Sequence, residues 1–213
     1  MNQRTRIKIC GITEAVDAEA AVSLGVDALG FIFYQKSPRY IAPEKAREII
    51  DTLPPFVDAV GVFVDETAEV IDEIFHYCGL GFIQLHGHES ADFCDHIPGR
   101  IIKALRLGPG AEPVDTEGFA GKVSGFLLDT YEKGVPGGTG TPFDWERLHG
   151  IYLPGPIVLA GGLNPDNVGT AIGQMRPSAV DVSSGVELTP GKKDHQAMER
   201  FVLAVAEADN IAP

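Results

Sequence analysis

Eight short apolar runs recur along the chain, and most of the stretches between them have the hydrophobic period of amphipathic helices. Strands that alternate with helices in this way form right-handed βαβ units and pair into a parallel sheet. Eight such units can close on themselves, so that no strand keeps a free edge. We therefore predict an α/β fold, a single (β/α)8 TIM barrel with eight parallel strands. The predicted strands cover residues 6–10, 28–33, 58–64, 81–86, 100–106, 124–129, 156–160 and 178–183.

Residues that favour helix starts stand at the beginning of several of the intervening stretches. Thr13, Thr67 and Asn164 are suited to cap a helix, and Pro43 suits the first helical position. Residues 108–122 differ, because their glycines and prolines allow only a short or irregular helix. The predicted helices cover residues 13–24, 43–53, 67–78, 90–97, 144–152, 165–175 and 193–208.

The length of the chain, 213 residues, is at the low end for one closed α/β barrel. With 44% hydrophobic residues it can bury one sizeable core. No linker or shift in composition marks a second unit, so we expect one catalytic domain over residues 1–213.

Charge and cysteine content exclude several classes of partner. The net charge is −13, and no basic run with interleaved aromatic residues is present, so we expect no nucleic acid partner. We also expect no membrane partner, because no segment approaches the roughly 20 apolar residues that span a bilayer and the first residues do not form a signal peptide. The three cysteines, at 10, 78 and 94, have no spacing typical of a disulfide framework or a zinc site. A reducing cytoplasm and the absence of a bound metal fit this pattern.

Polar or glycine residues stand at the ends of most of the predicted strands. In an α/β barrel, the carboxyl ends of the strands form the mouth where catalysis takes place. This arrangement therefore predicts an enzyme. The residues concerned are Cys10, Arg39, His86, Asp129, Gly161, Gly162, Ser183 and Ser184.

Cys10 and Asp129 are the two candidates for proton transfer. Cys10 precedes Gly11 and a predicted helix start, where backbone N–H groups and the helix dipole favour a thiolate, so it suits a base or nucleophile. The alternative is a buried thiol that acts as a small hydrophobe, which is our interpretation of Cys78 and Cys94. Asp129 ends an apolar strand, and desolvation there raises the pKa of a carboxyl and suits a general acid.

The period of a strand indicates which side chains share a face. Lys8 shares its face with Cys10, and Asp181 shares its face with Ser183. Since the first and eighth strands are neighbours in a closed barrel, we predict an ion pair between Lys8 and Asp181 inside it. The alternative hypothesis makes Lys8, or Lys103 on the fifth strand, the Schiff-base lysine of an aldolase-like enzyme.

Two loops late in the chain predict a phosphate site. Gly161 and Gly162 follow the seventh strand, and residues 183–185 (Ser183, Ser184 and Gly185) follow the eighth. Those two loops are the usual phosphate site of such barrels, and glycine lets backbone N–H groups approach the anion. The alternative is that the glycines serve only tight turns. A third glycine-rich segment, 137–140, is more typical of a mobile lid.

Nine segments, in order along the chain, are similar to motifs of phosphoribosylanthranilate isomerases of tryptophan biosynthesis. They are KICGIT (8–13), FYQKSPRY (33–40), GVFV (61–64), QLHG (84–87), LLDT (127–130), GGTGTPFDW (137–145), LAGGLNPDNV (159–168), VDVSSGVE (180–187) and PGKKD (190–194). The resemblance implies a (β/α)8 barrel that converts N-(5-phosphoribosyl)anthranilate to 1-(2-carboxyphenylamino)-1-deoxyribulose 5-phosphate by an Amadori rearrangement, without metal or organic cofactor. The small-molecule substrate would be the main partner, for a monomer or homodimer.

The resemblance also implies roles for individual residues. It makes Cys10 the general base, Asp129 the general acid and Arg39 the partner of the anthranilate carboxylate. It places Asp181 beside the sugar and His86 at the mouth, where both would contact substrate. Besides the lysine-dependent aldolase, two alternatives remain: a metal-dependent sugar-phosphate epimerase, for which the chain offers mainly His86 as a ligand, and a non-catalytic phosphate-binding barrel.

Overall fold

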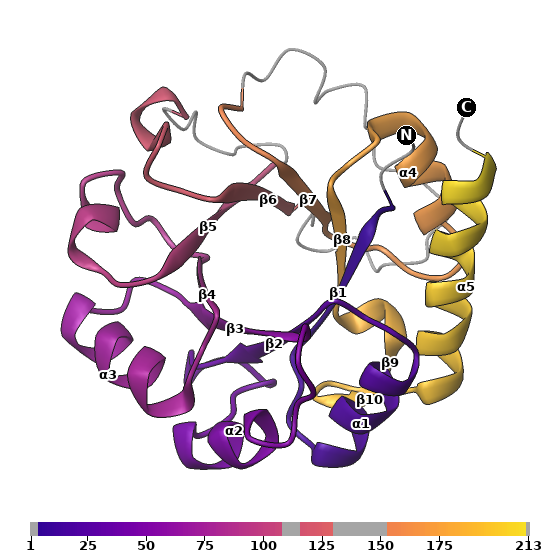
Figure 1. Ribbon diagram of the computed structural model, residues 1–213, viewed down its shortest axis with the longest axis horizontal. Helices are drawn as coiled ribbons and strands as arrows, with labels where there is room; N and C mark the ends of the chain where they lie inside the picture. The colour runs from indigo at the N-terminus through magenta and orange to yellow at the C-terminus, as the bar shows by residue number, and fades with distance from the viewer. Residues whose placement is uncertain (1–3, 108–115, 130–152, 212–213) are drawn as a thin grey trace.

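The protein is a closed barrel of eight parallel strands surrounded by helices (Figure 1). The structure is a computed structural model that describes residues 4–107, 116–129 and 153–211. All eight predicted strands are confirmed, with ends that differ by at most one residue from the prediction. The strands are β1 (Arg6–Cys10), β2 (Ala28–Ile32), β3 (Asp58–Phe63), β4 (Phe82–Leu85), β5 (Arg100–Arg106), β6 (Gly125–Asp129), β7 (Ile157–Ala160) and β8 (Ala179–Val182).

The first and last strands of the barrel pair with each other and close it. Lys8 on β1 lies opposite Asp181 on β8, and on the other side of β1 Cys10 lies opposite Gly30 of β2. Just before β1, Thr5 is tied to the end of the chain, because its backbone N–H and hydroxyl both donate to the carboxylate of Asp209. Residues near both ends of the described chain therefore help to hold the barrel closed beside β1.

Among the described residues, five α-helices are present, and they lie outside the barrel (Figure 1). Two predicted starts are confirmed: the Thr67 hydroxyl accepts a hydrogen bond from the Val70 N–H, and Pro43 is the first residue of its helix. None of the helices in the described residues is long and apolar enough to cross a membrane. The helices are α1 (Ala15–Ser23), α2 (Pro43–Ile50), α3 (Ala68–Cys78), α4 (Val168–Met175) and α5 (His195–Ile211).

The helix predicted over residues 90–97 is wrong, because that segment forms only the 3₁₀ helix η1 (Phe93–His96). Its backbone bonds span three residues rather than four, and Ile97 is already extended. Pro98 explains the early end, since a proline pushes the preceding residue out of the helical region. In the described part of 108–122 there is one short 3₁₀ helix, η2 (Glu117–Phe119), as predicted. The predicted helix 144–152 lies outside the described residues.

Two predicted helix caps are also wrong. Thr13 does not cap α1: Glu14 occupies the cap position without a side-chain bond, and the Thr13 hydroxyl donates instead to the Gly191 carbonyl. The helix predicted from residue 165 begins at Val168. The side chain of Asn164 accepts from the backbone N–H groups of Asp166 and Asn167 and so holds a turn there.

A small hairpin after the barrel was not predicted. The 3₁₀ helix η4 (Ser184–Val186) leads into β9 (Glu187–Thr189), which pairs antiparallel with β10 (Lys192–Lys193). Gly191 in the turn has φ of 83°, a conformation that favours glycine. As a result α5 begins at His195, later than predicted.

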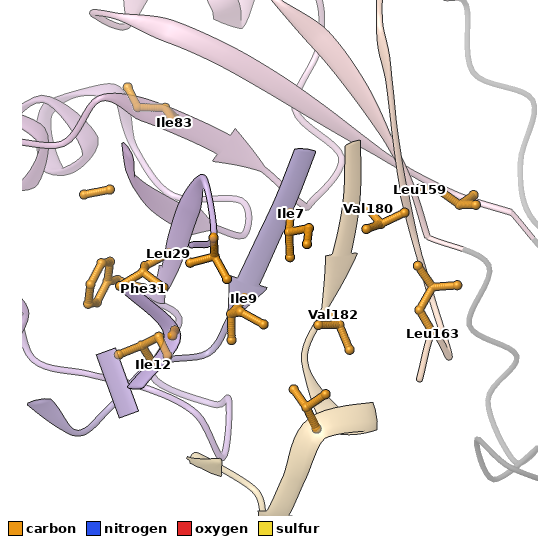
Figure 2. Close-up of a cluster of buried hydrophobic side chains, with 14 of the residues drawn as sticks. Ile7, Ile9, Ile12, Leu29, Phe31, Ile83, Leu159, Leu163, Val180 and Val182 are labelled. Atoms are coloured by element: carbon orange, nitrogen blue, oxygen red, sulfur yellow. The ribbon is translucent and has the colours of Figure 1, made fainter. Parts of the chain in front are cut away.

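Alternate residues of the strands face the two sides of the sheet, and each side has its own apolar cluster. The larger cluster packs between strands and helices, and in Figure 2 Ile7 and Ile9 on β1 lie beside Val180 and Val182 on β8. The interior of the barrel has a smaller apolar cluster of Ile102, Ala104, Leu127 and Ala160. The remaining inner positions include the buried polar side chains of Lys8, Gln84 and Asp181, which lie toward the mouth.

Candidate active site

The sequence-predicted residues gather at the carboxyl end of the barrel because its strands are all parallel. Cys10 and Asp129 are the last residues of β1 and β6. Asp181 lies within β8, and each of the others follows a strand: Arg39 lies in the loop after β2, His86 directly after β4, Gly161 and Gly162 directly after β7, and Ser183 to Gly185 directly after β8.

The thiol of Cys10 is buried beside the ammonium of Lys8. A Cβ atom built on Gly30 would lie 2.7 Å from Cys10 Sγ and 3.0 Å from Lys8 Nζ, so both atoms occupy the space over that glycine. Burial raises the pKa of the Cys10 thiol above its ordinary value; Lys8 opposes this shift and Asp181 adds to it. The helix start that was expected to favour a thiolate does not lie next to Cys10, because α1 begins only at Ala15.

The predicted ion pair between Lys8 and Asp181 is confirmed. Lys8 Nζ lies 2.9 Å from Asp181 Oδ1, and the two side chains are only 5% and 9% exposed. Burial alone lowers the pKa of an amine, but Asp181 and Cys10 outweigh it and raise the pKa of Lys8. Lys8 is thus an ammonium, which cannot form a Schiff base without losing its proton.

Lys103 does not offer a free amine either. It is buried, and its Nζ lies 2.7 Å from Glu89 Oε2 and 2.8 Å from the Gly87 carbonyl. By strand period it lies on the face opposite Ala104, which belongs to the cluster inside the barrel. Lys103 therefore supports the loop after β4. Neither lysine of the aldolase hypothesis is placed for its chemistry.

His86 joins β4 to Asp129 across the mouth. Its Nε2 lies 3.2 Å from Asp129 Oδ2, and its Nδ1 lies 2.9 Å from Nε2 of the buried Gln84. Because the Gln84 amide nitrogen donates to Nδ1, a neutral imidazole carries its proton on Nε2 and donates it to Asp129. His86 and Gln84 are two residues apart and so share a face by strand period, but the contact with Asp129 needs the curvature of the barrel.

Arg39 is held by a carboxylate that sequence reasoning missed. Arg39 Nε lies 2.8 Å from Glu187 Oε1, and Arg39 Nη2 lies 2.6 Å from Glu187 Oε2. Nη1 has no hydrogen-bond partner among the described residues, and the side chain is 21% exposed. The stem of Arg39 crosses Gly11, where a Cβ atom would lie 2.7 Å from Arg39 Cδ. The guanidinium is therefore fixed at one edge and keeps a free edge.

Lys193 is a second missed residue, and it connects three parts of the mouth. Its ammonium is fully buried and lies 2.6 Å from the Cys10 carbonyl, 3.2 Å from the Ser183 carbonyl and 2.9 Å from Glu187 Oε1. Burial lowers the pKa of Lys193, although Glu187 opposes the shift. Burial alone raises the pKa of a carboxyl, but hydrogen bonds from Arg39 and Lys193 hold the pKa of Glu187 below its ordinary value. The motif PGKKD was the only sequence signal for Lys193.

The two loops of the predicted phosphate site lie in direct contact. A Cβ atom on Gly185 would lie 1.9 Å from the Leu163 carbonyl oxygen, so the backbone after β8 packs on the backbone after β7. Gly161 and Gly162 have φ of 83° and 67°, which explains why glycine occupies both positions. The Ser183 hydroxyl is buried and has no hydrogen-bond partner among the described residues.

The described residues contain no group of three or more His, Cys, Asp or Glu side chains that could hold a metal ion. All three cysteines are free. The glycine-rich segment 137–140, predicted to form a lid, lies outside the described residues.

Comparison with known proteins gives a match to a protein-family model and to several curated proteins. Residues 7–204 match the family model for N-(5'phosphoribosyl)anthranilate (PRA) isomerase. The chain is 50% identical over 213 residues to N-(5'-phosphoribosyl)anthranilate isomerase of Geobacter sp. (strain M21), an alignment that covers 98% of this chain and 100% of the relative.

Several similar solved structures carry the same enzyme name as the sequence matches. Phosphoribosyl anthranilate isomerase from Thermotoga maritima superimposes with a TM-score of 0.84 at 44% identity, over 95% of this chain and 99% of that chain. A second isomerase structure, in complex with reduced 1-(o-carboxyphenylamino)-1-deoxyribulose 5-phosphate, gives a TM-score of 0.79 at 43% identity with the same coverage. A third, of monomers generated from the dimeric Thermotoga maritima enzyme, gives a TM-score of 0.78 at 41% identity, again with that coverage.

Proposed function

The chain belongs to the N-(5'-phosphoribosyl)anthranilate isomerase family, and on this basis we propose that Cys10 and Asp129 are its general base and general acid. The protein is an isomerase of tryptophan biosynthesis that converts N-(5-phosphoribosyl)anthranilate to 1-(2-carboxyphenylamino)-1-deoxyribulose 5-phosphate. The observation that carries the residue assignment is the placement of both side chains at the same end of the barrel, on β1 and β6.

The reaction needs one proton donor and one acceptor. Asp129 donates a proton to the furanose ring oxygen, the C1′–O bond breaks, and the anthranilate nitrogen supplies the electron pair that forms the iminium. Cys10, as thiolate, then removes the proton from C2′, and those electrons neutralise the iminium to give an enolamine. The enolamine tautomerises to the ketone when a proton is added at C1′ and lost from the C2′ hydroxyl. The Nε2–H of His86 orients the Asp129 carboxyl toward the ring oxygen.

We assign the two charged ends of the substrate to different sides of the mouth. Arg39 keeps one nitrogen without a partner among the described residues, which suits the anthranilate carboxylate. The phosphate is assigned to Gly161, Gly162 and residues 183–185, where the Ser183 hydroxyl lacks a partner in the described structure. Asp181 uses Oδ1 for Lys8, and we assign its second oxygen to a sugar hydroxyl.

We further propose that residues 1–213 act as one catalytic unit in the cytoplasm, as a monomer or homodimer. The free state of all three cysteines supports a reducing compartment. A dimeric isomerase is among the similar structures, and this supports the homodimer.

The test is the isomerase assay on two variants, in which the loss of anthranilate-type fluorescence is monitored. We expect Cys10→Ala and Asp129→Asn each to reduce kcat by roughly 10²-fold or more, since each removes one proton-transfer group. Cys78→Ala is the matched control: it removes a buried thiol at the end of α3 and should retain normal kcat. Near-normal kcat in either active-site variant, with chemistry rate-limiting, would show that its role is wrongly assigned.

A further inference from the structure

The ion pair inside the barrel lies directly beside the proposed base. Lys8 and Cys10 are two residues apart on β1 and share its inner face. Gly30 lies opposite Cys10 in the β1–β2 register, and its lack of a side chain leaves the space in which Lys8 Nζ and Cys10 Sγ lie side by side. Since Asp181 holds Lys8 from the opposite strand at 2.9 Å, the ammonium has a fixed position.

An ion pair at this depth is not required for packing. Burying two charges has a large desolvation cost, and well-packed apolar residues are often as stable or more stable. Another part of the interior of this barrel is filled in that way, by Ile102, Leu127 and their neighbours. The pair is therefore expected to have a function where it is placed, which is next to the thiol.

We propose that the Lys8–Asp181 pair is a positioning device that supplies a fixed positive charge beside Cys10 and thereby stabilises its thiolate during turnover. The proposal rests on the assignment of Cys10 as the base. Burial opposes the thiolate, and Lys8 is the largest influence in its favour. Asp181 acts in the opposite direction, because its negative charge partly cancels that of Lys8 and keeps the thiolate basic enough to remove a carbon-bound proton.

Two other cations face Cys10 from neighbouring elements. Lys193 on β10 donates to the Cys10 carbonyl, and Arg39 after β2 also interacts electrostatically with the thiol. Both are already paired with Glu187, which offsets their charge. The pair of Lys8 with Asp181 is the one whose charges lie on the same inner face as the thiol.

The two members of the pair should have opposite effects on the ionisation of Cys10. We expect Lys8→Met to raise the pKa of Cys10 by about one unit or more, which corresponds to a roughly tenfold smaller thiolate fraction at a fixed pH below that pKa. We expect Asp181→Asn to lower the pKa of Cys10 and to increase the thiolate fraction by a similar factor. The double variant should lie between the two.

The direct measurement is the rate of alkylation of Cys10 by iodoacetamide in the full chain without substrate. Mass spectrometry of the peptide that carries Cys10 separates it from the other two cysteines. A variant that merely loosens the barrel would be alkylated faster in every case, so opposite changes for Lys8→Met and Asp181→Asn cannot come from access. The matched control is Lys103→Met, which breaks the buried pair with Glu89 on the other face of the sheet and should leave the alkylation rate of Cys10 within about twofold.

The acid limb of the kcat/KM profile is the second readout. It should move to higher pH in Lys8→Met by the amount that alkylation gives. Equal alkylation rates in wild type and Lys8→Met, or changes of the same sign in Lys8→Met and Asp181→Asn, would overturn the proposal. If alkylation shifts as expected while the acid limb stays in place, the pair controls the thiol but Cys10 is not the base, which overturns the proposed function instead. Should Lys8→Met fail to fold, Asp181→Asn and the double variant provide the same comparison.

Discussion

At the scale of single residues, the arrangement around the thiol depends on a glycine that has no chemistry of its own. Gly30 gives Cys10 and Lys8 the room to lie side by side. In the sequence it is one small residue within an apolar run, and only the register of β1 against β2 shows that it lies opposite Cys10. Its role was not predicted, because an apolar run gives no chemical signal at a glycine, unlike the opposite charges of Lys8 and Asp181 on β1 and β8.

We predict that Gly30→Ala lowers kcat by about 10²-fold, since a Cβ atom 2.7 Å from Cys10 Sγ must displace the reacting atom. Steady-state kinetics with the isomerase assay checks this, and circular dichroism checks the fold. A variant with normal kcat would mean that the thiol has room to move without losing its reaction geometry.

Arg39 was predicted from the sequence, whereas its partner Glu187 was not. They are 148 positions apart in the sequence, and the closing of the barrel and the hairpin after it bring them together. A motif can identify a cation at a strand end, but it cannot show that the cation is already bound to a buried carboxylate.

Arg39→Met should weaken capture of the substrate by about 1.5–3 kcal/mol, the usual contribution of a charge-assisted hydrogen bond. The affinity for inorganic phosphate should be retained, because the phosphate is assigned to the loops after β7 and β8. The measurement compares kcat/KM for the substrate with the inhibition constant of phosphate in wild type and variant. Equal losses in both would assign Arg39 to the phosphate or to the fold.

At the scale of elements, the strands were predicted well because buried parallel strands appear as nearly continuous apolar runs. Helix starts were predicted less well, since tertiary contacts compete for the capping side chains. Thr13 bonds the hairpin turn at Gly191 instead of its own helix. The hairpin was missed because its strands have three and two residues, too few to show a period. It nevertheless supplies Glu187 and Lys193 to the mouth.

Helix α4 contains a glycine that contributes nothing to packing. A Cβ atom on Gly173 would meet nothing within 4 Å. We predict that Gly173→Ala raises the free energy of unfolding by about 0.5–1 kcal/mol, because alanine loses less backbone entropy in a helix. Urea denaturation measures the change. Gly185→Ala is the contrasting substitution: its Cβ atom would lie 1.9 Å from the Leu163 carbonyl oxygen, so it should destabilise the protein. Lower stability in Gly173→Ala would contradict the prediction.

At the scale of the whole molecule, the ion network of Arg39, Glu187 and Lys193 holds the hairpin against the ends of β1 and β8. The pKa of Glu187 is lower in the folded protein than its ordinary value of 4.5. The stabilisation from its carboxylate is therefore complete above that value, and it is lost as the pH falls through the lowered pKa.

Glu187→Gln should accordingly reduce the free energy of unfolding by about 3–5 kcal/mol at neutral pH, the usual cost of breaking a buried ion pair. The difference from wild type should shrink as the pH falls below 4.5, because protonation of Glu187 then removes the same charge from the wild type. Chemical denaturation over a series of pH values gives both quantities. The exposed Glu199 in α5 provides a control, Glu199→Gln, with little effect. A difference that stays constant with pH would exclude Glu187 as its origin.

Lys193 also links the order of synthesis to the completion of the site. The strand that ends in Cys10 leaves the ribosome before its neighbour β8 and before the ammonium that holds the Cys10 carbonyl. A nascent chain that ends before residue 193 has its thiol without the contacts that fix it in place. We therefore expect polypeptides that end before residue 193 to lack isomerase activity, although they carry Cys10, Arg39 and Asp129.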